Sequence, residues 1–225
     1  VGTDESVTSS LAAVQNEAAV ADVNCEITIR HGNDPAAEIR SAALAANAQL
    51  LVIGRRLYPG ATEVGPVAQR ILAAAPCAVL VVAPGSQLWS RRVLVAFDGS
   101  DAARSATELA AQLAKPRLLP ITLFSITDSS GQLPPEIEDA AQLSIAELKL
   151  DGLTGDLSGG NGNIAEGILK AARDTGADLI VLYRHTRGGL SRKLLGSVGD
   201  EVIRGAEVPV LLVGETAQTG LDAAG

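Results

Sequence analysis

Short apolar runs rich in β-branched residues alternate along the chain with longer stretches in which apolar residues recur every three or four positions. Apolar runs without polar alternation are typical of strands buried on both faces of a parallel sheet, and the longer stretches predict amphipathic helices. Strands are predicted at residues 50–53, 77–82, 93–97, 121–126, 179–182 and 208–213. This alternation predicts an α/β fold with a doubly wound, mostly parallel sheet, whose ligands bind beyond the carboxyl ends of the strands.

The second half of the chain holds a full set of predicted elements. Helices are expected at residues 102–114, 134–146 and 197–204, and another begins near Asn163. Residues 148–150 are predicted as a weak third strand, and the Gly- and Asn-rich residues 151–163 as a flexible connector. No Gly-Lys-Ser or Gly-Lys-Thr follows these glycines, so the sequence does not indicate a phosphate loop there.

The two halves of the chain end in similar patterns. Asp34 caps a helix with Pro35 at its first position before the strand at 50–53, and Asn163 opens a helix of the same design before the strand at 179–182. A loop, a helix and a final strand follow in both halves. Two homologous domains are therefore predicted, at residues 1–84 and 91–214, with a tail at 215–225.

The first half is expected to be incomplete. Its opening residues match the end of a first strand, which makes Asp4 the counterpart of Asp98, and residues 23–30 already look like the third strand. The second strand and part of a helix then have no sequence to form them. We expect residues to be missing at a join near positions 14–17, and ordinary Cα spacing of about 3.8 Å through that region would contradict this.

Composition and charge narrow the function. Hydrophobic residues make up 47% of the 225 residues and aromatic residues only 2%, so the core must be built from aliphatic side chains. The net charge of -8 disfavours nucleic acid and anionic membranes as partners. Cys25 and Cys77 form no disulfide or metal-binding pattern. No apolar run reaches the ~20 residues of a membrane span, and we expect a cytoplasmic protein without membrane insertion.

The candidate chemistry lies in the loop before the last helix of the second half. Gly196 and Ser197 stand where that helix begins, and a helix start offers unpaired N–H groups and a positive dipole end to a phosphate. His185 has no second histidine or cysteine in the same loop, so no metal site is predicted. Ser100 and Ser197 lack an evident histidine and acid pair, so no catalytic residue is predicted.

The order of these features resembles the universal stress protein family. The strand ending at Asp98, the turn at 186–190, the Gly196-Ser197 pair and the final strand follow one another as in that family, over nearly all of residues 91–214 and more loosely over 1–82. The chain resembles a tandem member. The resemblance implies five-stranded, mostly parallel sheets of order 3-2-1-4-5 in two domains, the first of them incomplete.

The resemblance also implies how such a chain works. Family members are non-enzymatic stress-response or regulatory modules, and their final strands pair across a dimer. Here residues 79–82 and 210–213 take those places, so we expect a pseudo-dimer within one chain, able to form a homodimer and to bind an unknown protein partner. An exposed apolar edge strand favours such pairing.

A site for ATP or another adenine nucleotide follows from the same resemblance. Members that bind ATP carry a glycine, two residues, a second glycine, nine residues and then Gly-Ser or Gly-Thr. Gly196 and Ser197 match, but Tyr183 and Thr186 replace the two glycines, and in the first half Leu57 and Pro66 depart from the pattern. The candidate nucleotide-binding residues are Asp98, Gly99, Arg187, Gly188, Gly189, Gly196 and Ser197.

Three interpretations of this loop stay open. It is a solvated basic edge that turns at its two glycines, or a weakened nucleotide site in which Arg184 or Arg187 supplies charge, or a site for another anion or a protein. The alternatives to a nucleotide sensor are a ligand-free interaction module and an accessory regulatory domain of a transporter or kinase. A nucleotide-hydrolysing enzyme is disfavoured because no general base is evident.

Overall fold

The computed structural model describes residues 4–55, 64–83, 85–184 and 197–214. By the contacts within it, the chain divides into two compact units, Val1–Asp34 and Pro35–Gly225. The predicted boundary between two domains at residues 84–91 falls inside the second unit and stays a prediction.

The first unit is built around α1 (Asp4–Val20), which contains four alanines and no glycine or proline. The helix runs through positions 14–17, and the missing residues expected near that point stay a prediction. After a left-handed Asp22, the N–H of Val23 donates to the carbonyl of Ala18 at 2.9 Å. Residues 23–30 form no strand, contrary to prediction, because their alternating pattern finds no neighbouring strand in the described residues.

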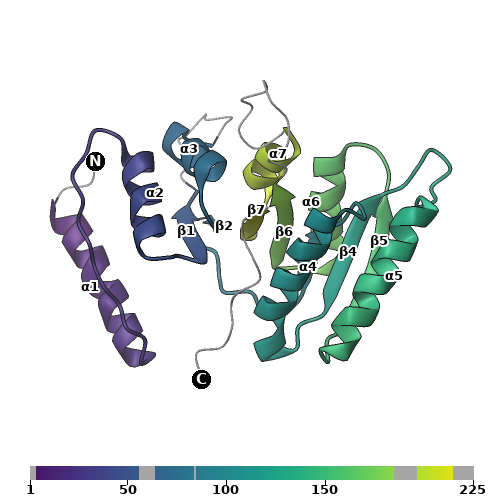
Figure 1. The fold of residues 1–225 in the computed structure, drawn as a ribbon, viewed down its shortest axis with the longest axis horizontal. Helices are drawn as coiled ribbons and strands as arrows, with labels where there is room; N and C mark the ends of the chain where they lie inside the picture. The colour runs from purple at the N-terminus through teal and green to yellow at the C-terminus, as the bar shows by residue number, and fades with distance from the viewer. Residues whose placement is uncertain (1–3, 56–63, 84, 185–196, 215–225) are drawn as a thin grey trace. The chain divides into compact units, whose positions relative to one another are not determined.

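The second unit contains one seven-stranded sheet in the order β1-β2-β7-β6-β3-β4-β5 (Figure 1). Its strands are β1 (Leu50–Gly54), β2 (Ala78–Val82), β3 (Val93–Ala96), β4 (Ile121–Ile126), β5 (Gly155–Gly160), β6 (Leu179–Arg184) and β7 (Val210–Gly214). All neighbours are parallel except β2 and β7. The α/β class and the order 3-2-1-4-5 are confirmed, since β5-β4-β3-β6-β7 has that order. In the described residues the first half contributes two strands, β1 and β2.

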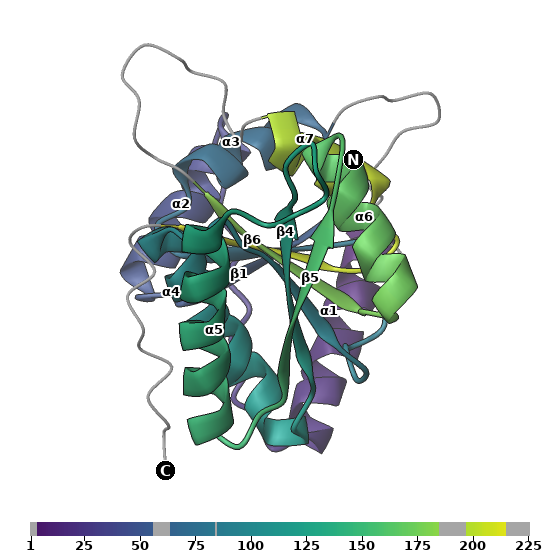
Figure 2. The same ribbon diagram turned by 90° about the vertical axis from the view of Figure 1, so that its right-hand side faces the viewer.

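Helices cover both faces of the sheet. They are α2 (Pro35–Ala45), α3 (Pro66–Ala74), α4 (Asp101–Ala114), α5 (Pro135–Leu150), α6 (Ile164–Thr175) and α7 (Ser197–Gly205), with a 3-10 turn at Lys115–Arg117. Alternate residues of a strand face opposite sides. Val95 and Val181 accordingly belong to the core cluster with residues of α4 and α5, whereas Leu94 and Ile180 belong to the one with residues of α6 and α7. Figure 2 shows α4 and α5 on one side of the sheet and α6 on the other.

The seam between the two halves is the antiparallel pair of β2 and β7. Val79 lies opposite Leu212, and Leu80 opposite Leu211. A gap-free alignment of residues 65–83 with 196–214 also matches Leu80 to Leu211, so the halves meet about a pseudo-two-fold axis. The predicted intrachain pairing of the two final strands is confirmed.

A strand also forms where the sequence predicts a flexible connector. β5 runs parallel to β4 within residues 151–163, and α5 continues through the expected strand at 148–150. A Cβ built on Gly160 would lie 2.9 Å from Cζ of Phe124, and one on Gly159 would lie 2.8 Å from Cγ2 of Thr127. These glycines therefore allow close side-chain packing and do not mark flexibility.

Candidate functional site

Asp98 lies at the carboxyl end of β3, where a doubly wound sheet places its ligands. It follows the buried Phe97, and its own side chain is exposed. The N–H of Ser100 donates to Oδ1 of Asp98 at 3.0 Å, and Oγ of Ser100 caps α4 by accepting from the N–H of Ala103. Gly99 adopts a φ of 80°, which allows the tight turn between strand and helix.

Tyr183 forms a hydrogen bond with the second oxygen of this carboxylate. Its hydroxyl donates to Oδ2 of Asp98 across the neighbouring parallel strands β3 and β6. The pKa of Tyr183 lies well above its ordinary value. Burial raises it most, followed by the hydrogen bond to Asp98 and the negative charge of that carboxylate, and a hydrogen bond with Ser100 lowers it by less. The tyrosine at the position of the first motif glycine thus binds the carboxylate of Asp98.

Arg184 is directed to the other half of the chain. Its side chain is buried, and it donates from Nη1 to the carbonyl of Leu72 and from Nη2 to that of Ala75 at 3.2 Å. These carbonyls lie at the end of α3 in the other half. A Cβ on Gly214 would lie 2.5 Å from Nη2, so this glycine leaves room for the guanidinium. Arg184 as a source of charge for a nucleotide stays a prediction, which these contacts disfavour.

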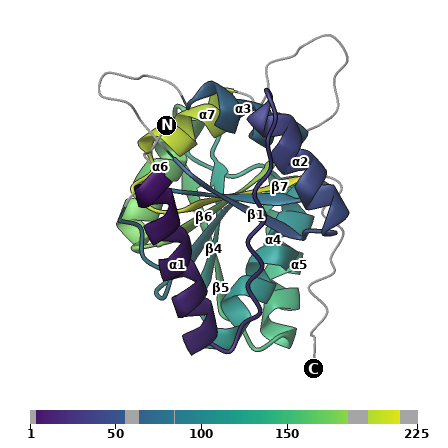
Figure 3. The ribbon, with the colours of Figure 1, turned by 90° about the vertical axis from the view of Figure 1, so that its left-hand side faces the viewer.

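Arg55 makes the matching contact in the opposite direction. Its Nη1 donates to the carbonyls of Ile203 and, at 2.9 Å, Arg204, at the end of α7. A gap-free alignment of residues 34–55 with 163–184 places Arg55 on Arg184, just as Leu72 aligns with Ile203. Burial lowers the pKa of both guanidinium groups. Figure 3 shows α3 and α7 side by side at the same end of the sheet.

The other predicted site residues are placed only in part. Ser197 is the exposed first residue of α7, which follows the carboxyl end of β6, so it lies at the same end of the sheet as Asp98 and Gly99. Arg187, Gly188, Gly189 and Gly196 lie outside the described residues. Within the described ranges, no group of three His, Cys, Asp or Glu side chains is arranged to hold a metal ion.

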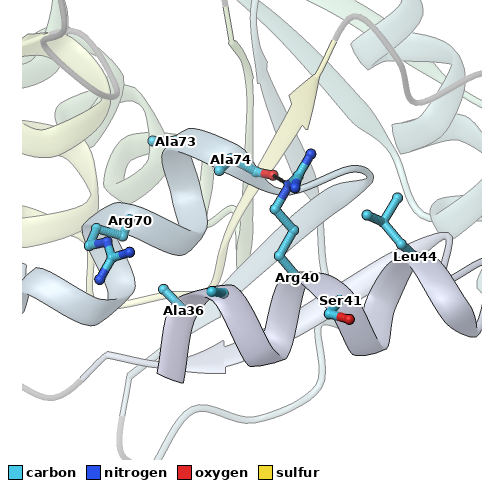
Figure 4. A pocket seen from close by; sticks show the side chains of 8 residues that line it. Ala36, Arg40, Ser41, Leu44, Arg70, Ala73 and Ala74 are labelled. Atoms are coloured by element: carbon cyan, nitrogen blue, oxygen red, sulfur yellow. Dashed lines mark hydrogen bonds between the residues drawn. The ribbon is translucent and has the colours of Figure 1, made fainter. Parts of the chain in front are cut away.

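A groove of about 470 Å³ lies between α2 and α3 (Figure 4). Small and apolar residues line most of it, together with Arg40 and Arg70. Nε of Arg40 donates to the carbonyl of Ala74 at 3.0 Å, and Figure 4 shows this side chain crossing from α2 to α3. No sequence pattern predicted this groove.

Two contacts of the site also escape the sequence-based prediction. The sequence shows Tyr183 as a lost glycine, but a strand order of 3-2-1-4-5 makes β3 and β6 neighbours, which would have indicated its contact with Asp98. Arg55 and Arg184 follow matched strands of the repeat, and that shared position was the available signal.

The comparisons with known proteins agree on one family. The profile of the universal stress protein family matches residues 2–83 and 90–214. A universal stress protein of Thermus aquaticus, from the QAH/OAS sulfhydrylase 3' region, is 34% identical over 134 residues, covering 55% of this chain and 98% of the relative.

Solved structures share the fold over most of the chain. A universal stress protein from Archaeoglobus fulgidus superposes with a TM-score of 0.77 at 21% identity, covering 95% of this chain and 80% of the other. A putative universal stress protein from Pseudomonas aeruginosa superposes with a TM-score of 0.72 at 19% identity, covering 92% of this chain and 78% of the other.

In the described parts of the chain, no helix is both long and apolar enough to cross a membrane.

Proposed function

Because this chain belongs to the universal stress protein family, we propose that it is a non-enzymatic regulatory module of the stress response that senses an adenine nucleotide through its second half. The supporting residues are Asp98 and Gly99 after β3 and Ser197 at the start of α7. Together they offer a carboxylate for the nucleoside and helix N–H groups with a hydroxyl for phosphate.

The hydrogen bond between Tyr183 and Asp98 carries the proposal. With Oδ1 bound by the N–H of Ser100 and Oδ2 by the tyrosine hydroxyl, the carboxylate is engaged before any ligand arrives. A nucleotide that uses Asp98 must displace or share this hydroxyl. Binding is therefore weak and coupled to movement of the Tyr183 side chain, which suits a sensor of abundant nucleotide better than a permanent carrier.

Calorimetric titration of ATP, ADP and AMP into the purified chain tests this function. We expect saturable binding by wild type that is lost in the Asp98→Ala, Ser197→Ala double variant. Tyr183→Phe removes only the hydroxyl and should tighten binding on the order of tenfold, because the displaced hydrogen bond no longer opposes it. No binding by wild type or by Tyr183→Phe at millimolar nucleotide would refute the sensor.

The groove between α2 and α3 supports a second candidate, a protein-interaction module. At the aligned positions of the second half, α6 and α7 carry Glu166, Lys170, Arg173 and Arg204, whereas the first half carries Ala37, Ser41, Leu44 and Ala73. Leu44 is 49% exposed. A groove whose charged lining residues are Arg40 and Arg70 replaces a surface that carries more charged side chains, as expected where a partner binds. Binding of a partner that Leu44→Glu abolishes, without any nucleotide binding, would favour this candidate.

A further inference from the structure

The groove between α2 and α3 differs at its centre from the equivalent surface of the second half. In the gap-free alignments of the two halves, Arg40 falls on Leu169 and Ala74 on Gly205. A Cβ built on Gly205 would lie 2.5 Å from Cδ1 of Leu169, so this leucine packs tightly against α7. In the first half a cation and a methyl group stand where that close apolar contact would be, and the groove opens there.

The guanidinium of Arg40 is held in place by the main chain of α3. Its Nε donates to the carbonyl of Ala74 at 3.0 Å. Within the described residues its two Nη groups form no hydrogen bond, so both can donate to a ligand. A guanidinium can hold a carboxylate through two parallel hydrogen bonds. Because the contact with Ala74 already restricts this side chain, binding costs less conformational entropy.

Both charged residues that line the groove are basic. Arg70 contributes the second guanidinium from α3, and its aligned position in the second half carries Glu201. The other charged residues at aligned positions of the second half have both signs and are Glu166, Lys170, Arg173 and Arg204. In a chain with a net charge of -8, a groove of one positive sign favours an anionic ligand.

The rest of the groove suits a short apolar chain. Figure 4 shows Arg70 and Leu44 on opposite sides of Arg40, and alanines of both helices line the space between. From Ala36 to Leu44 the groove follows α2 for about 12 Å, at a rise of about 1.5 Å per residue. Its volume of about 470 Å³ is that of a small-molecule site. A protein interface takes about 20–30 residues a side, of which this groove could form only a part.

We propose that the groove binds an aliphatic carboxylate of medium chain length. The carboxylate accepts hydrogen bonds from the Nη groups of Arg40, close to the second positive charge of Arg70. The alkyl chain lies on the alanines of α2 and α3 and covers Leu44, which is 49% exposed. The groove contains none of the candidate nucleotide-binding residues, so this ligand binds independently of a nucleotide.

Calorimetric titration of decanoate, below its micelle concentration, tests the ligand class. We expect one saturable site on the wild-type chain. Decanol has the same chain without the charge and should bind at least about tenfold more weakly, because the charge-assisted hydrogen bonds are lost. Acetate has the charge without the chain and should give no saturable binding. No saturable binding of decanoate at millimolar concentration would overturn the proposal, as would equal affinities for decanoate and decanol.

Substitutions of the basic and apolar lining residues place the ligand in the groove. Arg40→Met should weaken decanoate binding at least about tenfold, whereas Arg173→Met, an exposed arginine of α6 outside the groove, should leave it unchanged. Leu44→Ser should weaken binding, and Leu143→Ser on α5, where the leucine is 53% exposed, is the matched control. Decanoate binding that survives both Arg40→Met and Leu44→Ser would overturn the proposal.

The second half supplies a variant that closes the groove. Arg40→Leu with Ala74→Gly installs the pair that packs as Leu169 and Gly205, so circular dichroism should show the wild-type fold while decanoate binding is lost. Retained binding in this folded variant would place the ligand elsewhere and overturn the proposal. ATP titration of the same variant should match wild type. A failed titration with ATP therefore refutes the sensor and leaves this site intact, and the reverse also holds.

Discussion

Arg55 and Arg184 occupy matched positions of the internal repeat, and each donates to main-chain carbonyls at the end of a helix in the opposite half. The last carbonyls of a helix have no partner within it, and a cation there also meets the negative end of the helix dipole. The two arginines therefore hold the halves together on either side of the β2–β7 seam.

The buried member of this pair should matter more for stability. Arg184→Met keeps much of the volume but leaves the carbonyls of Leu72 and Ala75 without their donor, and we expect a loss of about 2–4 kcal/mol in the free energy of unfolding. Arg55→Met, at a half-buried site, should cost about 1 kcal/mol. Denaturant unfolding measures both.

Arg40→Met is the matched control for these two variants. Arg40 also donates to a carbonyl of α3, that of Ala74, but from an exposed side chain, so its loss should stay within about 0.5 kcal/mol. Equal effects of Arg184→Met and Arg40→Met would contradict the structural role assigned to Arg184.

Tyr183 should resist ionisation at alkaline pH. Burial and the neighbouring Asp98 raise its pKa, so the neutral phenol stabilises the fold below the ordinary tyrosine value of about 10, and this stabilisation is lost as the pH rises through the folded-state pKa. In a Tyr58→Phe background, Tyr183 is the sole tyrosine. Phenolate absorbance should then appear only well above pH 10, and Asp98→Asn should bring it nearer to 10. Ionisation near pH 10 in the folded Tyr58→Phe chain would argue against the Asp98 contact.

Asp178 should make the fold sensitive to acid. Burial alone would raise the pKa of its carboxyl, but hydrogen bonds from the N–H groups of Ser90, Arg92 and Arg91 outweigh burial and lower it. The ionised carboxylate of Asp178 therefore stabilises the fold at pH values above its unfolded-state pKa of about 3.9. This stabilisation is lost as the pH falls through the lower folded-state pKa.

Asp178→Asn should accordingly destabilise the chain by about 1–3 kcal/mol at pH 7, and the difference from wild type should shrink below pH 4. Urea unfolding at several pH values measures it. Asp174→Asn, which removes only an exposed ion pair with Lys170, should cost under about 0.5 kcal/mol. A difference between Asp178→Asn and wild type that does not change with pH would be inconsistent with the contacts of Asp178.

Gly160→Ala should weaken the packing between β5 and β4. The added methyl would lie 2.9 Å from Cζ of Phe124, and the rigid ring must shift to admit it, at about 1–3 kcal/mol. Gly54→Ala in β1 meets no atom within 4 Å and serves as the control. A thermal unfolding midpoint for Gly160→Ala equal to that of Gly54→Ala would show that β5 packs less closely than described.

The sequence predicted most strands of the second half because each is a buried apolar run. β5 could not be predicted as a strand from the sequence. Its glycines Gly159 and Gly160 pack against side chains of β4 and of the loop after it, and no local sequence pattern indicates that contact. For residues 23–30 the error was the opposite one, a strand predicted where none forms. Alternating apolar and polar residues form a strand only where a neighbouring strand can pair with them.

The candidate site was predictable to the same depth. Asp98 could be placed from the end of its strand, because ligand-binding residues follow parallel strands. The hydrogen bonds of the Arg184 side chain could not be predicted. Its partners Leu72 and Ala75 lie more than 100 residues away in sequence and are brought near only by the pairing of β2 and β7. Tyr183 lay between these cases, because its partner follows from strand order but its hydrogen bond does not.

The seam also dictates when each half can mature on the ribosome. Leu80 pairs with Leu211, about 130 residues later, and synthesis at about 5–20 residues per second takes roughly 7–26 s to cover that distance. Until then β2 has no partner on its inner side, whereas the strands from β3 to β7 can assemble among themselves once β7 has emerged. The half that is made first therefore completes its folding last, on a template that the second half provides.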